Sequence, residues 1–251
     1  MDLAEALRLG DRELVSFVGA GGKKTAMQHL VGEAAHRDVT VGYTTTTHTP
    51  PPDGLPQVIA APDDLPDALA DRGAPVAFAA ERVENPERAD EKVRGHDPSV
   101  VESVFASGLF DWLLVKADGA RRREFKAPGR NEPVVPETST VVTVVASVRA
   151  VGSRLEAPTV HRPDRVAAIA GRDVGTTLTP DAMGTVLAST NGGLKNVPGG
   201  ATAVLLINKA DTPALRESAR DIVAATFERT DRFSHGLVTS FDTGMLETVE
   251  S

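Results

Sequence analysis

The chain has 251 residues, 41% of them hydrophobic and 25% charged, which is typical of a globular protein with room for one large α/β domain or two small ones. Its net charge of −8 argues against nucleic acid as a partner, because nucleic-acid binding requires a basic surface. The absence of cysteine excludes disulfides, thiolate metal sites and a cysteine nucleophile. The longest apolar runs have the length of strands and the first residues lack a signal pattern, so we expect a cytoplasmic protein with no membrane partner.

Near the start of the chain, a short apolar run leads into a glycine-rich turn. Residues 1–12 predict a short amphipathic helix and residues 14–18 a buried strand, while a second helix is expected from residue 25. Between strand and helix, glycines allow main-chain N–H groups to approach an anion, and the helix N-terminus and the lysines attract negative charge. We therefore predict a phosphate-binding loop that contacts a nucleotide through Gly19, Ala20, Gly21, Gly22, Lys23, Lys24 and Thr25.

This loop departs from the usual pattern G-x-x-x-x-G-K-[ST] in two places. If Gly22 and Lys23 are the Gly-Lys pair, the first glycine should fall at Phe17, and the hydroxyl that binds magnesium should fall at Lys24. A shorter loop, G-x-x-G-K, fits residues 19–23 and resembles that of the amide ligases of cell-wall synthesis; Thr25 would then supply the displaced hydroxyl. The alternative is a strand-to-helix turn that binds no ligand.

Hydroxyl groups follow the next predicted strand, residues 39–43. A run of threonines continues into three prolines, and at the carboxyl edge of a parallel sheet these hydroxyls would face a ligand. The candidate substrate-binding residues here are Thr45, Thr46, Thr47 and His48. The alternative is a turn of β-favouring threonines that the prolines end. Beyond it we expect a strand at 57–61, a helix at 63–71, a strand at 75–80, an exposed loop or short helix at 81–98 and a helix at 99–107.

An apolar strand that begins at residue 110 ends in Asp118 and Gly119, as the second acidic motif of a nucleotide-binding site does. The Asp118 carboxylate would hold Mg²⁺ directly or through water, although Asp-Gly is also a common turn dipeptide. A dense group of cationic residues follows, which favours anion recognition or stabilisation of charge in a transition state, with a solvated basic loop as the alternative. The candidate substrate-binding residues here are Arg121, Lys126, Arg130 and Glu132.

The last part of the chain continues the alternation of strands and helices. A strand is expected at 138–147, one helix after Pro163 and another with Thr179 as its N-cap. The buried strand at 203–207 then ends in Asn208, Lys209 and, two residues on, Asp211, which is the pattern by which GTPases read guanine. The aspartate accepts hydrogen bonds from the guanine N1–H and 2-amino groups, which adenine does not present. A helix at 213–228 and a last strand at 234–241 complete the chain.

These elements predict an α/β fold of three layers, with a mostly parallel sheet covered by helices on both faces, like that of P-loop NTPases. The glycine loop, the threonine run, the Asp-Gly turn and the Asn-Lys-x-Asp motif each follow a strand, so they should gather along one edge of the sheet. We find no linker strong enough to divide the chain, and we expect a single nucleotide-binding domain over residues 1–251.

Together the motifs resemble those of the YqeC-type family, whose members are described as selenium-dependent hydroxylase accessory proteins. The resemblance rests on Val-Gly-Ala-Gly-Gly-Lys at 18–23, Thr-Thr-Thr-Thr-His at 44–48, Ala-Asp-Gly-Ala at 117–120, Lys-Ala-Pro at 126–128, Glu-Pro at 132–133, His-Arg-Pro at 161–163 and Ile-Asn-Lys-Ala-Asp at 207–211. It implies a role in the maturation of a molybdenum hydroxylase, and it adds His161 and Arg162 to the candidate substrate-binding residues. Two departures, Lys24 for threonine and Lys116 for glutamate, remove a hydroxyl and an acid from the expected metal site.

From the motifs and the resemblance together, we expect an accessory protein that binds GTP in preference to ATP and uses Mg²⁺ to hydrolyse the nucleotide or transfer its phosphoryl group. Lys23 and Asp118 would be catalytic, Thr25 and Asp118 would hold the metal, and Asp211 would read the base. The client would be a molybdenum hydroxylase or its pterin-type cofactor, whose phosphate the arginines would bind. The alternatives are a module that binds a nucleotide or phosphate without turnover, and a small-molecule kinase.

Overall fold

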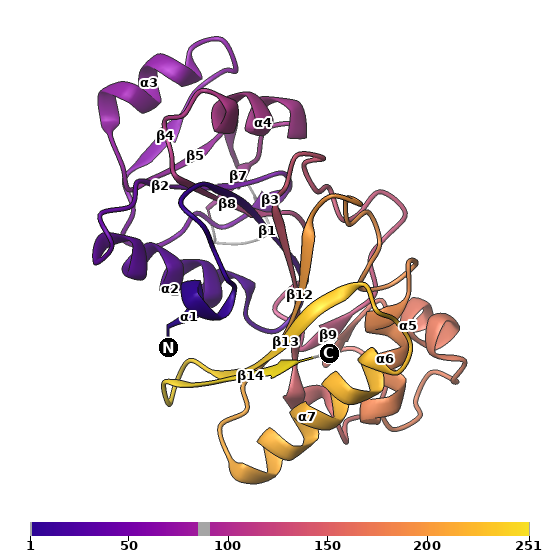
Figure 1. The fold of residues 1–251 in the computed structure, drawn as a ribbon. Coiled ribbons are helices and arrows are strands. Elements are labelled where there is room, and N and C mark those ends of the chain that lie inside the picture. Colours follow the sequence, from indigo (N-terminus) through magenta and orange to yellow (C-terminus); the bar gives the residue numbers. More distant parts are fainter. Residues whose placement is uncertain (1, 85–90, 251) are drawn as a thin grey trace.

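The computed structural model describes residues 2–84 and 91–250, and its centre is a nine-stranded sheet (Figure 1). The strand order is β14-β13-β12-β10-β1-β8-β2-β5-β4, and every strand is parallel to its neighbours except β14, which pairs antiparallel with β13 at one edge. The strands are β1 (Glu13–Gly19), β2 (Val41–Thr45), β4 (Gln57–Ile59), β5 (Val76–Ala79), β8 (Trp112–Lys116), β10 (Val141–Ser147), β12 (Thr202–Asn208), β13 (Phe233–Ser240) and β14 (Met245–Glu250).

Helices cover both faces of the sheet, because the central strands are apolar on both sides. In β12, for example, Leu205 and Ile207 pack into the core under α5, α6 and α7, while Val204 and Leu206 pack into the core under α1 and α2. Helices α3 and α4 cover the rest of the face that α5, α6 and α7 occupy. The helices are α1 (Leu3–Ala6), α2 (Lys23–Ala35), α3 (Leu65–Arg72), α4 (Pro98–Ala106), α5 (Pro163–Ala170), α6 (Pro180–Ala188) and α7 (Pro213–Phe227), with a 3₁₀ turn at Val148–Ala150. The predicted three-layer α/β fold is thereby confirmed.

Several element predictions need correction. Helix α2 begins at Lys23 rather than at residue 25, and β14 follows the strand that was expected to be the last. The loop or short helix expected at 81–98 instead contains β6 (Glu81–Val83) and β7 (Lys92–Arg94), which form a small antiparallel sheet with β3 (His48–Thr49). Residues 85–90 of that prediction lie outside the described residues. A further pair, β9 (Phe125–Lys126) and β11 (Val160–His161), is parallel.

The four sequence motifs meet at one edge of the sheet, as expected. Since β1, β2, β8 and β12 are parallel, their carboxyl ends point the same way. Lys116, at the end of β8, pairs with Phe17 of β1 on one side and with Thr45 of β2 on the other, and Asn208 of β12 pairs with Ser147 of β10. In residues 2–84 and 91–250, no helix has the length and apolarity needed to cross a membrane.

Candidate functional site

The glycine loop is held in a conformation that requires glycine. Gly19 has a φ of 93° and Gly22 a φ of 150°, both in the region that side chains rarely adopt. A Cβ atom at Gly22 would lie 2.2 Å from the Asn208 amide nitrogen, and the same amide donates a hydrogen bond to the Gly21 carbonyl at 3.2 Å. The loop therefore packs directly against the Asn-Lys-x-Asp motif, and α2 starts immediately after it.

Behind the loop, Asp118 lies between two lysines. Its Oδ1 atom is 2.8 Å from the Lys23 ammonium, and its Oδ2 atom accepts hydrogen bonds from the Lys126 ammonium at 2.9 Å and from the Gly19 N–H at 2.8 Å. Lys23 also donates to the Gly19 carbonyl. Burial opposes the charge on Asp118, yet the charges of Lys23 and Lys126 prevail and lower its pKa to about 2. Asp118 is therefore a buried carboxylate that ties the loop to β8.

Lys126 extends this cluster rather than joining an exposed cationic patch. Its side chain is 2% exposed, and its ammonium donates to the Gly119 carbonyl at 2.6 Å and to Glu132 at 3.1 Å. Arg162 in turn donates to Glu132 at 2.8 Å. The structure thus brings together four residues predicted from separate motifs, and their charges alternate along the chain Asp118, Lys126, Glu132 and Arg162.

Two further lysines stand at the mouth of the loop. Lys116 is only 7% exposed, and its ammonium reaches the Thr47 hydroxyl at 3.4 Å. Burial and the neighbouring charge of Lys23 lower the pKa of Lys116 to about 7, so an approaching anion would favour its charged form. Lys24 is half-buried, and its ammonium lies 3.4 Å and 3.3 Å from the carbonyls of Pro50 and Pro51. Burial lowers the pKa of Lys24, while the charge of Asp53 opposes that shift.

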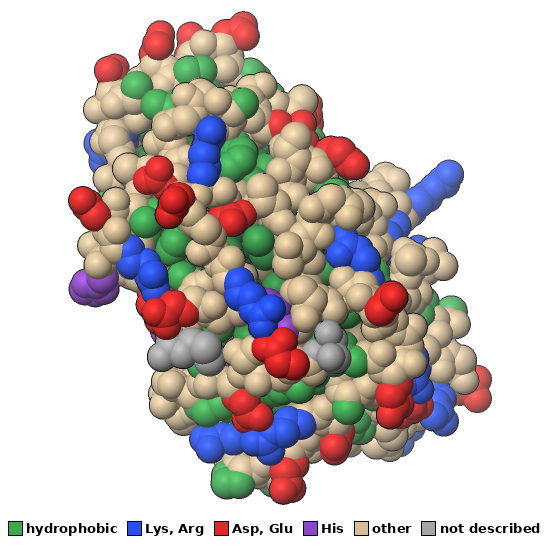
Figure 2. All heavy atoms as spheres, viewed as in Figure 1, with side chains coloured by type: hydrophobic (Ala, Val, Ile, Leu, Met, Phe, Trp, Pro, Cys, Tyr) green, Lys and Arg blue, Asp and Glu red, His purple; other side chains and the backbone are tan. Residues whose placement is uncertain are grey.

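A cleft of about 1200 Å³ opens in front of the loop. Among the described residues, nine lysine and arginine side chains line it against three carboxylates, although the chain as a whole is acidic. On the face of the molecule drawn in Figure 2, by comparison, acidic and basic side chains are interspersed. The cationic lining residues are Lys23, Lys24, Lys92, Lys116, Arg121, Arg122, Arg123, Arg162 and Lys209. Such a concentration of positive charge in a concave site favours an anionic ligand.

The Asn-Lys-x-Asp motif lies beside the loop, and the side chains of Lys209 and Asp211 already contact other residues of the chain. Lys209 lines the cleft, and its ammonium is 2.8 Å from both carboxylate oxygens of Glu124. Asp211 accepts hydrogen bonds from the Ser240 hydroxyl at 2.6 Å and from Arg149 at 2.5 Å. Sequence reasoning missed Glu124, Arg149 and Ser240, because nothing in their local pattern indicates which distant side chain they contact.

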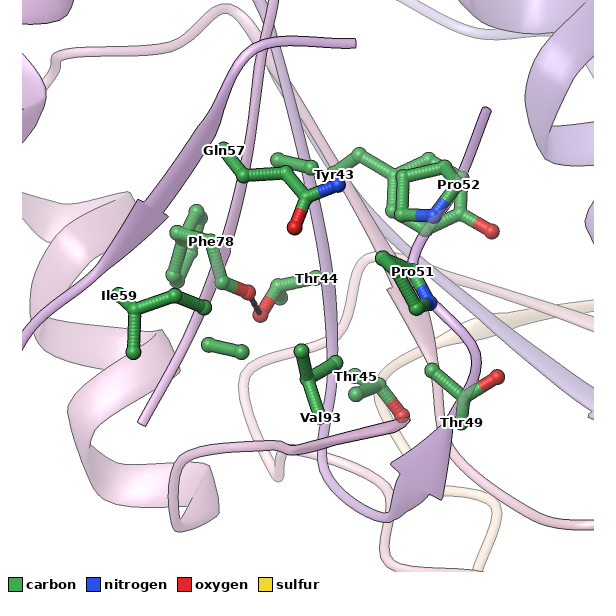
Figure 3. Close-up of a pocket in the computed structure, with 12 residues that line it drawn as sticks. Tyr43, Thr44, Thr45, Thr49, Pro51, Pro52, Gln57, Ile59, Phe78 and Val93 are labelled. Carbon is green, nitrogen blue, oxygen red and sulfur yellow. Dashed lines mark hydrogen bonds between the residues drawn. The ribbon is translucent and has the colours of Figure 1, made fainter. Parts of the chain in front are cut away.

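The threonine run contributes less to the cleft than expected. The Thr45 hydroxyl donates to the Lys116 carbonyl at 2.7 Å and that of Thr46 to the Val134 carbonyl at 2.6 Å, whereas His48 lines the cleft. Figure 3 shows a separate small space beside these residues, where the Thr44 hydroxyl bonds to the Phe78 carbonyl. Its volume of about 10 Å³ is that of one water at most.

The basic stretch and the His-Arg-Pro motif are divided between cleft and surface. Arg121 lines the cleft with a left-handed φ of 49°, whereas Arg130 is exposed outside the cleft lining. His161 also lines the cleft, next to Arg162. Burial, followed by the charges of Arg162 and Lys126, lowers the pKa of His161 to about 4, so its imidazole is neutral near pH 7.

The residues assigned to magnesium do not fit that ion. Mg²⁺ requires oxygen ligands in near-octahedral geometry, but both oxygens of Asp118 face cationic groups behind the loop, and Asp118 is absent from the cleft lining. Lys24 occupies the position of the usual hydroxyl, and only Thr25 of the assigned pair lines the cleft. Over the described ranges, no three His, Cys, Asp or Glu side chains are grouped to hold a metal ion.

Similarities to known proteins include a family model, a curated relative and a solved structure. Residues 15–164 match the family model described as YqeC protein. The uncharacterized protein YqeC of Escherichia coli (strain K12) is 30% identical over 199 residues, which are 78% of this chain and 75% of that protein. The crystal structure of the hydrogenase maturation factor HypB from Archaeoglobus fulgidus aligns with a TM-score of 0.41 and 14% identity, over 96% of this chain and 87% of that chain.

Proposed function

The chain belongs to the YqeC family, and on that premise we propose that it is an accessory protein that binds a guanine nucleotide in the cationic cleft. The observation that carries the proposal is the hydrogen bond from the Asn208 amide to the Gly21 carbonyl. It joins the loop suited to phosphates to the motif suited to guanine, so one nucleotide can reach both. The N–H groups of the loop and the start of α2 would hold the phosphates.

The base would be read by Asp211. Guanine offers two adjacent donors, its N1–H and its 2-amino group, which a carboxylate accepts together. Asp211 already accepts from Ser240 and Arg149, but each carboxylate oxygen has two lone pairs, and the Arg149 side chain is half-exposed. Lys209, held by Glu124, would lie along the face of the base.

Calorimetric titration with GTP and ATP, each with Mg²⁺ and with EDTA, tests this proposal. We expect GTP to bind and ATP to bind much more weakly. Lys23→Ala should abolish binding, because it removes the cation at the phosphate loop. If the parent protein binds GTP neither with Mg²⁺ nor with EDTA, the proposal is overturned.

The role of Asp211 has a sharper test. In Asp211→Asn, the side-chain amide donates where the carboxylate accepted, so it no longer matches the 2-amino group of guanine but does match the 2-carbonyl oxygen of xanthine. We expect GTP affinity to fall and XTP affinity to rise in this variant. Loss of affinity for both GTP and XTP would mean that Asp211 supports the loop structure and does not read the base.

Turnover is a separate question from binding. Because Lys24 and Asp118 do not provide a magnesium site, the structure favours a module that binds the nucleotide without hydrolysing it. Phosphate release under excess GTP and Mg²⁺ should be absent in the parent protein, and its appearance in Lys24→Thr would identify Lys24 as the residue that prevents turnover. Release by the parent protein would instead identify a hydrolase or, with an acceptor present, a phosphotransferase.

The client belongs to the proposal as well. The cleft exceeds the space that one nucleotide needs, since ligand pockets commonly measure about 300–1,000 Å³. Arg121 and Arg162 lie in its lining, where they can bind a second anion such as the phosphate of a pterin-type cofactor. We propose that the client is a molybdenum hydroxylase or its cofactor. Co-purification with such an enzyme, lost in Arg121→Ala, would support this, and unchanged capture in that variant would argue against it.

A further inference from the structure

Three lysine ammonium groups lie where the phosphate loop meets the cleft. Lys23, Lys24 and Lys116 all line the same surface, together with Gly21 and Gly22 of the loop. Lys23 has a carboxylate partner in Asp118. Within the part of the chain that the structure describes, Lys24 and Lys116 contact only neutral oxygens, namely two carbonyls and one hydroxyl. The side chains of these two lysines are therefore available to a ligand.

The burial of Lys116 is the stronger indication. Lys116 is almost fully buried, and its hydrogen-bond partner is a neutral hydroxyl rather than a carboxylate, so an anion in the cleft would be the partner that favours its charged form. The residues before it in β8 are apolar. The backbone of residue 116 pairs with β1 and β2, and an apolar side chain at this position would allow the same backbone pairing. The open side of Lys116 faces the cleft, and an anion bound there would complete its contacts.

Lys24 adds the second charge at the position of the usual metal-binding hydroxyl. In a P-loop of the usual pattern, that hydroxyl and an acidic residue hold Mg²⁺, and the ion neutralises the phosphates. Here the acid, Asp118, is already paired with Lys23 and Lys126. The positive charge near the phosphates thus comes from side chains that the chain itself supplies.

Resting on the guanine-nucleotide function proposed above, we propose that Lys24 and Lys116 take the place of Mg²⁺ and that the cleft binds the metal-free triphosphate. Magnesium bound to a triphosphate cancels two of its negative charges. The metal-free form therefore interacts more strongly with a site that contains additional lysines. This distinguishes the site from one built around a metal, where affinity depends on the ion.

The test is calorimetric titration of the full chain with GTP and with inorganic tripolyphosphate, each in EDTA and in excess Mg²⁺. Both ligands should bind in EDTA, and Mg²⁺ should leave their affinities unchanged or lower them. Lys24→Met and Lys116→Met should each weaken binding in EDTA by about tenfold to about a hundredfold, the range for a hydrogen bond to a charged group. In the double variant, the preference for the metal-free ligand over its Mg²⁺ complex should be smaller than in the parent protein, because two of the lysines that interact with the extra negative charge are gone.

A matched control is Lys195→Met, which removes a lysine outside the cleft lining and should leave both affinities unchanged. Thermal unfolding of each variant verifies that it is folded. Binding of GTP by the parent protein only when Mg²⁺ is present would overturn this inference and leave the proposed function standing. Binding of tripolyphosphate in EDTA with no added affinity for GTP would support the inference and overturn the guanine proposal. Binding of neither ligand would overturn both.

Discussion

At the scale of single residues, the contacts of Asp118 make Lys126 a structural cation. It lies between two carboxylates, with Asp118 at 2.9 Å and Glu132 at 3.1 Å, and is almost fully buried. In Lys126→Met, Asp118 keeps Lys23, but the cluster loses the cation shared by its two acids. We expect the free energy of unfolding to fall by about 3–5 kcal/mol, as it does when one partner of a buried ion pair is removed. Urea unfolding would measure it.

An exposed ion pair provides the control for this prediction. Arg154 lies 3.2 Å from Glu156, with 71% and 46% of the two side chains exposed. Arg154→Met should change the free energy of unfolding by less than about 1 kcal/mol, because solvent screens exposed pairs. Equal effects of the two substitutions would show that burial does not govern the contribution of Lys126.

His161 predicts a pH dependence of stability. Its pKa is lowered from 6.5 to about 4 in the folded protein, so between these values the unfolded chain binds the proton more readily. The contribution of His161 to stability is thus complete above about pH 6.5 and is lost as the pH falls through about 4. In His161→Gln, the free energy of unfolding should fall less steeply than in the parent protein as the pH decreases across this window. Denaturant titrations at several pH values would measure it. Identical slopes for variant and parent would contradict the assignment.

At the scale of elements, the turn from β1 to α2 depends on Gly22. Gly22→Ala combines a φ of 150° with a Cβ atom 2.2 Å from the Asn208 amide nitrogen. We expect the free energy of unfolding to fall by about 1–3 kcal/mol and nucleotide binding to be lost. Urea unfolding and calorimetric titration would measure the two effects. Gly32→Ala is the matched substitution later in α2, where a Cβ meets nothing within 4 Å, and it should stabilise by about 0.5–1 kcal/mol. Retained binding in Gly22→Ala would refute the role of the turn.

Long strands could be predicted from the sequence, whereas the shortest strands could not. The long apolar strands and their terminal motifs were predictable, because a buried parallel strand needs a continuous apolar run and its carboxyl end is fixed by the parallel sheet. The two-residue strands at His48–Thr49 and Phe125–Lys126 were not, because they are too short to show a period. Lys126 likewise reads as one more cation of a basic stretch. Its burial depends on Asp118 and Glu132, which only the folded chain brings to it.

At the scale of the whole molecule, the distribution of charge separates the cleft from its surroundings. The chain carries a net charge of −8, yet the cleft lining is strongly cationic. Composition gives the charge of the whole chain, so it did not reveal the local field. That field depends on residues from β8, α2 and the 121–123 stretch, which are distant in sequence and meet only at the edge of the sheet.

The continuity of the sheet leads to the last prediction, that the chain unfolds as one cooperative unit. Strand β1 from the start of the chain lies between β8 and β10, and β10 pairs in turn with β12 from the last quarter. The centre of the sheet cannot divide between β8 and β10 without breaking a ladder of β1, which joins the first residues of the chain to strands far along the sequence. Differential scanning calorimetry should show one transition, with calorimetric and van't Hoff enthalpies equal. Two resolved transitions, or a calorimetric enthalpy well above the van't Hoff value, would instead show that the two sides of the sheet fold as separate domains.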